Sequence, residues 1–203
     1  MIFSELFKAI LDKVFITLFL RIYRKLKMKR EKNGKYLAEF VYGGTDGAVT
    51  TFAVVAGAIG ASLNSAVILI LGFANLFADG FSMAVSNYLS VKSERELHAR
   101  HGHIKLERKE PLKTAIATFL SFFIIGLVPL LFFVLALIFP DLESNKFTYS
   151  IILTACAFAF VGFVKGEVIG SNRIKSSIET LLIGSLAASI AYLVGFILKG
   201  LLI

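Results

Sequence analysis

Four side chains that could contact a metal ion recur at every fourth position of one apolar stretch. They are Asn75, Asp79, Met83 and Asn87. Residues four apart lie on the same face of a helix, so this spacing predicts a polar, sulfur-bearing stripe along one helix. A further carboxylate, Asp46, stands in a glycine-rich segment of the preceding apolar stretch.

The chemistry of these side chains favours a divalent cation. Counting inward from the ends of the two stretches at ~1.5 Å per residue places Asp46 and Met83 at similar depth. A carboxylate facing a thioether suits a borderline-soft ion such as Fe²⁺ or Mn²⁺ better than Mg²⁺ or Ca²⁺. Ionisable groups inside a membrane span are costly and therefore functional candidates. We predict metal ligands at Asp46, Asn75, Asp79 and Met83.

Each of these residues also has a purely structural interpretation. Asp46 could satisfy irregular backbone at the glycine-rich start of its helix, and Met83 alone is more often core filler than a ligand. Asp79 precedes Gly80 and could mark a kink. The combination of depth, spacing and ligand type favours an ion site over these alternatives.

Weaker signals lie near the ends of the apolar stretches. Helical spacing puts Glu94, His98 and His101 on one face, which is compatible with a metal relay. We favour a solvated basic segment there, because the surrounding lysines and arginines would repel cations. Glu179 and Lys165 are interpreted first as capping or snorkelling groups, with proton coupling by Glu179 as the alternative.

The elements that position these residues are predicted to be membrane helices. The 203 residues are 57% hydrophobic and 18% charged, with a mean hydropathy of +0.78. A single cysteine, Cys156, rules out an intrachain disulfide, and the composition argues against a soluble enzyme or a disordered chain. The sequence therefore predicts an all-α, polytopic membrane protein with five spans of about 20 residues or more. The spans cover residues 40–61, 65–89, 113–139, 147–168 and 178–198.

Residues 1–35 are predicted to form a separate basic region. The first four turns are amphipathic, and a run rich in arginine and lysine follows. We expect this helix to lie on the cytoplasmic surface of the bilayer. The five-helix transmembrane domain is then 36–203, with a short cytoplasmic loop at 91–112.

Basic residues divide unequally between the two ends of the predicted spans. Alternate sides carry 20 and 2 of the 22 lysines and arginines. The positive-inside rule places the N-terminus in the cytoplasm and the C-terminus outside. This asymmetry explains the formal charge of +8 without a nucleic-acid partner. The lack of a targeting extension favours a prokaryotic plasma membrane.

Small residues recur at spacings of about four in several spans, which allows helices to approach closely. The pattern is compatible with a tight bundle or with an oligomer. An odd number of spans excludes a simple inverted repeat within one chain, so an internal two-fold axis would require a homodimer. The small residues are Gly43, Gly47, Ala53, Gly57 and Ala61, then Gly162, Gly166 and Gly170, then Ala187, Ala191 and Gly195.

The ordered set of motifs resembles the vacuolar iron transporter family. The matching segments are Gly43-Gly-Thr-Asp-Gly-Ala-Val-Thr-Thr-Phe52, Ala78-Asp-Gly-Phe-Ser-Met-Ala84, Phe160-Val-Gly-Phe-Val-Lys-Gly166 and the run from Glu179 to Gly195. The resemblance implies a five-helix dimer that exchanges Fe²⁺ or Mn²⁺ for protons along its interface. It also implies that Asp46 and Met83 lie in the ion path.

Two departures from that family pattern stand out. Asn75 occupies the position of a second-span glutamate, and Asp79, one turn later, could supply the missing charge. The connection at 91–112 is too short for the family's cytoplasmic metal-binding insert, so this chain resembles a short form.

Three functions compete on this evidence. The leading one is export of divalent iron or manganese by proton antiport, with the bilayer, the ions and protons as partners and no bound cofactor. A non-transporting membrane scaffold is the second. An intramembrane aspartyl protease is the third, and the depth estimate argues against it because it places Asp79 ~6 Å deeper than Asp46.

Overall fold

The computed structural model describes residue 17 and residues 36–100 and 109–202, and every regular element in those ranges is helical. The predicted all-α class is therefore confirmed for the described part of the chain. The α-helices are α3 (Leu37–Gly60), α4 (Ser65–Arg100), α5 (Pro111–Gly126), α6 (Leu131–Ile138), α7 (Lys146–Ile169) and α8 (Arg173–Leu202). Two short 3-10 turns, η3 (Val128–Leu130) and η4 (Pro140–Leu142), flank α6.

Four helical segments are long and apolar enough to cross a membrane. They are α4, the combined α5–α6 segment from Pro111 to Ile138, α7 and α8. The first predicted span, now α3, is not among them. It carries Glu39 and Asp46 and is rich in glycine and threonine, which lowers its hydropathy. Five spans thus remain a prediction, while four have support from length and composition.

The predicted ends of the spans agree with the helices to different degrees. The fourth span, 147–168, coincides with α7 within one residue at each end. The second was expected to end at residue 89, but α4 continues to Arg100. Much of the predicted loop at 91–112 is thus helical. The predicted interfacial helix at 1–35 lies outside the described residues except for Thr17.

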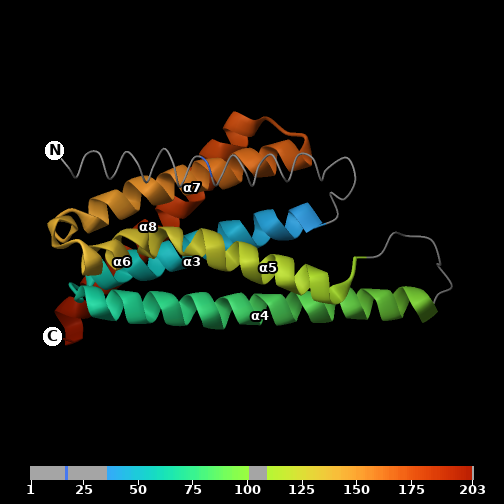
Figure 1. Cartoon of the computed structure of the whole chain (residues 1–203), viewed down its shortest axis with the longest axis horizontal. Coiled ribbons are helices and arrows are strands. Elements are labelled where there is room, and N and C mark those ends of the chain that lie inside the picture. Colours follow the sequence, from blue (N-terminus) through green and yellow to red (C-terminus); the bar gives the residue numbers. More distant parts are fainter. Residues whose placement is uncertain (1–16, 18–35, 101–108, 203) are drawn as a thin grey trace.

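Helix α3 occupies the centre of the bundle (Figure 1). It packs against α4, α5, α7 and α8. Helix α4 runs back against α3, α5 against α4 and α8 against α7, whereas α6 continues in the direction of α5. About half of its residues are buried, including glycines, alanines and Thr51. Enclosure by four neighbours explains how a helix of low hydropathy can be accommodated here, because its buried polar groups, Glu39 and Thr51, face protein.

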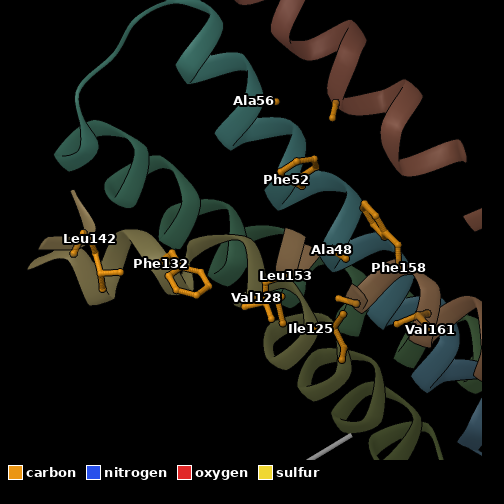
Figure 2. Close-up of a cluster of buried hydrophobic side chains, with 13 residues drawn as sticks. Ala48, Phe52, Ala56, Ile125, Val128, Phe132, Leu142, Leu153, Phe158 and Val161 are labelled. Carbon is orange, nitrogen blue, oxygen red and sulfur yellow. The ribbon is translucent and has the colours of Figure 1, made fainter. Parts of the chain in front are cut away.

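The apolar core connects α3 to α5, α6, α7 and α8 (Figure 2). Phe52 and Phe158 meet edge to face, with ring centroids 6.3 Å apart. This geometry is favourable for aromatic pairs. A second cluster joins α3 to α4 and α5 through residues such as Val55, Leu76 and Phe122. The two clusters fix α3 on opposite sides.

The third predicted span is broken in its middle. Helix α5 ends at Gly126, and the turn η3 contains Pro129 before α6 begins. Proline has no backbone N–H and cannot continue an α-helical ladder. The hydroxyl of Ser150 on α7 donates a hydrogen bond of 2.6 Å to the carbonyl of Pro129. This bond satisfies a polar group that the break would otherwise leave buried.

The small-residue stripes join helices within one chain. A Cβ on Gly195 of α8 would lie 2.0 Å from the carbonyl oxygen of Gly57 on α3. A Cβ on Gly47 would lie 2.3 Å from the carbonyl oxygen of Phe122, and one on Gly162 would lie 2.6 Å from the Cα of Ser177 on α8. The contacts of these glycines thus favour the tight-bundle interpretation over an oligomer.

The close contact of α3 with α8 yields the first prediction. We expect Gly195→Ala to destabilise the protein by about 1–3 kcal/mol, because the added methyl would overlap the backbone of Gly57. Gly200→Ala is the matched control, since Gly200 is also in α8 and has nothing within 4 Å of an added Cβ. Unfolding in mixed micelles, followed by circular dichroism, measures both. Equal stability of the two variants would contradict the close packing.

Candidate ion site

The register between α3 and α4 is set by an asparagine facing two threonines. The Asn75 amide nitrogen lies 3.5 Å from the hydroxyl oxygens of both Thr50 and Thr51. Thr50 in turn donates a hydrogen bond of 2.9 Å to the backbone carbonyl of Asp46. Asn75 is thereby held against α3, so it lies beside the segment that carries Asp46.

Asp79, rather than Met83, lies level with Asp46. The two helices run in opposite directions, so one turn from the Asn75 contact leads to Asp79 on α4 and to the Asp46 region on α3. The carboxylate of Asp79 is close enough to act electrostatically on that of Asp46. Both side chains are partly buried. The expected pairing of Asp46 with Met83 by depth is therefore wrong by about one turn of α4.

This register also removes the depth argument against a protease. That argument requires Asp79 to lie deeper than Asp46, whereas the contact of Asn75 with Thr50 and Thr51 puts the two aspartates at the same level. The choice between an enzyme and a transporter must therefore come from evidence other than depth.

Met83 and Asn87 continue the predicted stripe toward the basic end of α4. Met83 is partly buried and packs on the cluster that contains Val55 and Phe122. Asn87 donates a hydrogen bond of 2.6 Å to the hydroxyl of Thr118 on α5. The stripe thus contacts α3 at Asn75 and α5 at Asn87, and the Met83 thioether lies between these two points on α4.

The predicted relay is only partly within the described residues. Glu94 and His98 are on the last turns of α4, as their spacing predicted, with Glu94 exposed and His98 partly buried. His101 lies outside the described residues. Among the residues that the structure describes, no cluster of three or more histidines, cysteines or acids is arranged to hold a metal ion.

Glu179 is part of an ion pair between α7 and α8. Its carboxylate lies 3.7 Å from the Lys165 ammonium, and about half of the Glu179 side chain is exposed. This pairing agrees with the structural interpretation of both residues. It does not test a role in proton coupling.

One buried acid was missed by the sequence reasoning. Glu39, in the first turn of α3, is only 8% exposed and pairs with the Lys109 ammonium at 2.6 Å. Its second carboxylate oxygen is buried without a hydrogen-bond partner. Glu39 is seven residues before Asp46, so both lie on one face of α3. The seven-residue spacing between Glu39 and Asp46 is the feature of the sequence that could have indicated Glu39.

Together these residues form a column of polar groups beside α3. In order from the inner bundle toward the basic end, it contains Asn75, the Asp46–Asp79 pair, Met83 and Glu39. Carboxylate, amide and thioether groups are competent donors for borderline divalent ions. Two carboxylates at one level of the bundle would also provide the negative charge that a desolvated dication requires.

The chain as a whole is similar to known transporters. A model of the VIT family matches residues 37–104 and 97–196, and the two segments overlap at the connection between α4 and α5. A vacuolar iron transporter from Toxoplasma gondii is 25% identical over 246 residues, covering 89% of this chain and 82% of the relative. Vacuolar iron transporter 1 from Tulipa gesneriana is 29% identical over 212 residues, covering 76% and 83%.

A third relative has a similar extent of alignment. Vacuolar iron transporter 1 from Oryza sativa subsp. japonica is 26% identical over 216 residues, covering 79% of this chain and 84% of the relative. The alignment with the Toxoplasma protein is longer than the 203 residues of this chain. That relative therefore contains stretches that have no counterpart here.

The helix register supplies the second prediction. In a Cys156→Ala background, a short bis-maleimide should link Asp46→Cys to Asp79→Cys faster than it links Asp46→Cys to Met83→Cys. The reason is that Asp79 lies level with Asp46 and Met83 lies one turn away. Mass spectrometry of the linked peptides measures both yields. Faster linking of the Met83 position would show that the register is wrong.

Proposed function

Because the chain belongs to the VIT family, whose matched relatives are named iron transporters, we propose that it exports Fe²⁺, Mn²⁺ or both from the cytosol in exchange for protons. The chain is an integral membrane transporter and not an enzyme. Membership in this family decides between a transporter and a protease, which the positions of Asp46 and Asp79 alone do not. The direction of transport, the choice of metal and the coupling to protons are the proposed part.

The observation that carries the proposal is the Asp46–Asp79 pair. The two carboxylates stand at the same level of adjacent helices, and both are partly buried. A dication in a bilayer loses its hydration, and the cost is too large to leave without nearby negative charge. Two carboxylates offset its charge completely, whereas one would leave a net positive charge. Asp79 would thus replace the glutamate whose family position is occupied here by Asn75.

The same pair suggests how metal and proton movements are coupled. Two ionised carboxylates repel each other strongly in a low-dielectric environment. Either a proton or a dication relieves this repulsion, so the two compete for one site. Binding of a metal would displace protons, and return of protons would release the metal. Exchange then needs no separate proton site, and Glu179 is a secondary candidate.

Neighbouring groups would tune the preference for the metal. The Met83 thioether is a soft donor one turn from the pair, and the Asn75 amide oxygen is a neutral hard donor. The mixed set supports a borderline ion over Mg²⁺ or Ca²⁺. Glu94, His98 and His101 are proposed only as an additional relay at the basic end, and the solvated alternative for that segment is still favoured.

The ends of the helices support the proposed orientation. Most of the described basic residues belong to the end where α3, α5 and α8 begin. They are Lys92, Arg95, Arg100, Lys109, Lys113, Lys165, Arg173 and Lys175. Lys146, the first residue of α7, and Lys199, in the last turn of α8, belong to the other end, where α7 begins and α8 ends (Figure 1). The positive-inside rule then supports a cytoplasmic N-terminus and an outer C-terminus. A prokaryotic plasma membrane stays a prediction from the sequence.

Partial exposure of the aspartates supports a homodimer. Asp46 and Asp79 are only partly buried by their own chain. Carboxylates that face lipid are costly in a bilayer, so they require further protein or a water-filled path beside them. A second copy of the chain, related by a two-fold axis along the membrane normal, would supply this cover.

The pair leads to the third prediction. Asp46→Asn and Asp79→Asn should each reduce initial uptake of Fe²⁺ and Mn²⁺ into inside-out vesicles by at least about tenfold, because a buried dication would keep uncompensated charge. Asp141→Asn, at an exposed position in η4, is the matched control and should keep normal uptake. Rates are normalised to inserted protein.

The methionine provides a second arm of that experiment. Met83→Leu keeps the volume and removes the soft donor, so we expect partial loss that is greater for Fe²⁺ than for Mn²⁺. Near-normal uptake in Asp46→Asn would contradict the proposed ion path. Absence of uptake by the unsubstituted chain, with intact insertion and assembly, would instead favour a non-transporting scaffold.

A further inference from the structure

A cleft of about 430 Å³ opens between the basic ends of α4 and α5. It is lined by Tyr88, Lys92, Arg95 and Glu96 from α4 and by Glu110, Pro111 and Leu112 from the α5 side. Its volume is within the range of small-molecule pockets, roughly 300–1,000 Å³. None of these residues belongs to the polar column beside α3. The cleft is therefore a separate feature.

The cleft lies where the apolar part of the bundle changes to charged residues. On α4, charged residues begin at Lys92 and continue to Arg100, after a long stretch whose only charged residue is Asp79. On α5, the apolar span begins at Pro111. In a bilayer this level corresponds to the polar headgroups, at one edge of the hydrocarbon core.

Apolar tracks lead from the cleft toward the hydrocarbon core. Leu112, Ile116 and Leu120 form an exposed row at every fourth position of α5. Phe81 and Val85 are exposed on α4, on the same face as Tyr88 and Lys92. Phe77 of α4 packs on Phe123 of α5, with ring centroids 5.1 Å apart, and closes the seam between the two helices. Acyl chains can lie along both rows while a headgroup occupies the cleft.

The charges in the cleft are mixed. Lys92 and Arg95 provide two cations, and no ion pair to Arg95 occurs within the described residues. Glu96 lies 4.0 Å from the Lys92 ammonium, and Glu110 pairs with Lys113 at 2.7 Å. A purely anionic headgroup would be attracted by the cations but repelled by the Glu96 carboxylate. A headgroup that has a phosphate and a primary ammonium matches both signs.

We infer that this cleft binds an aminophospholipid of the phosphatidylethanolamine class. Lys92 and Arg95 contact its phosphate, Glu96 accepts hydrogen bonds from its ammonium, and its acyl chains follow the apolar rows of α4 and α5. Phosphatidylcholine would bind less well, because a quaternary ammonium has no N–H to donate. The inference requires membrane insertion but does not depend on which ion is transported.

The absence of tryptophan from the sequence permits a direct test. Tyr88→Trp places a single fluorophore in the cleft, in the full chain reconstituted into bilayers. Quenching by brominated phosphatidylcholine, relieved by unbrominated competitor lipids, gives relative affinities for each headgroup. Tyr192→Trp, on an exposed position of α8 toward the opposite end, is the matched control.

We expect phosphatidylethanolamine to displace the brominated lipid from the cleft of the Tyr88→Trp variant about fivefold better than phosphatidylcholine does. Lys92→Gln with Arg95→Gln should abolish this preference, and Glu96→Gln should shift it toward phosphatidylglycerol. The α8 control should show no headgroup preference. Equal affinity for all headgroups at the cleft would overturn the inference. Stronger binding of phosphatidylglycerol to the unaltered charges would overturn it as well.

Discussion

The structure depends on one constraint, which is that a helix with polar groups must be enclosed before it can lie in a bilayer. Helix α3 contains Glu39, Asp46 and several threonines and lacks the hydropathy of the other long helices. It is surrounded by α4, α5, α7 and α8. Its glycines allow this enclosure, because Gly47 and Gly57 touch the backbones of α5 and α8 directly. The neighbouring helices thus provide the apolar surface, and α3 can hold polar and acidic side chains.

Enclosure of α3 also limits where the proposed ion site can lie. Contacts with α5 and α8 occupy its small-residue faces, and the face toward α4 holds the threonines and Asp46. Asn75 fixes α4 against that face and brings Asp79 level with Asp46. When both are ionised, the two carboxylates carry two negative charges, which balance the two positive charges of one dication. The partial exposure of Asp46 and Asp79 is the reason to expect a second copy of the chain. The glycine stripes are not such a reason, because their contacts are made between helices of one chain.

Much of the fold could be predicted from the sequence, because hydropathy and helical spacing are local properties. The limits of α7 and the helical continuation through Glu94 and His98 follow from such patterns. The break at Pro129 was missed, since a long apolar run concealed it. The relative depth of Asp79 was also wrong, because counting from the span ends ignores side-chain contacts such as Asn75 with Thr50. Glu39 was overlooked because its partner, Lys109, is 70 residues away.

The central claim is that metal and protons compete for the Asp46–Asp79 pair. Its most direct test is proton movement in proteoliposomes that contain the full chain and a pH-sensitive dye in the lumen. External Mn²⁺, which is stable to oxidation under these conditions, should enter and alkalinise the lumen in proportion to the metal taken up. Entry of Mn²⁺ without any change in lumenal pH would contradict exchange at the pair.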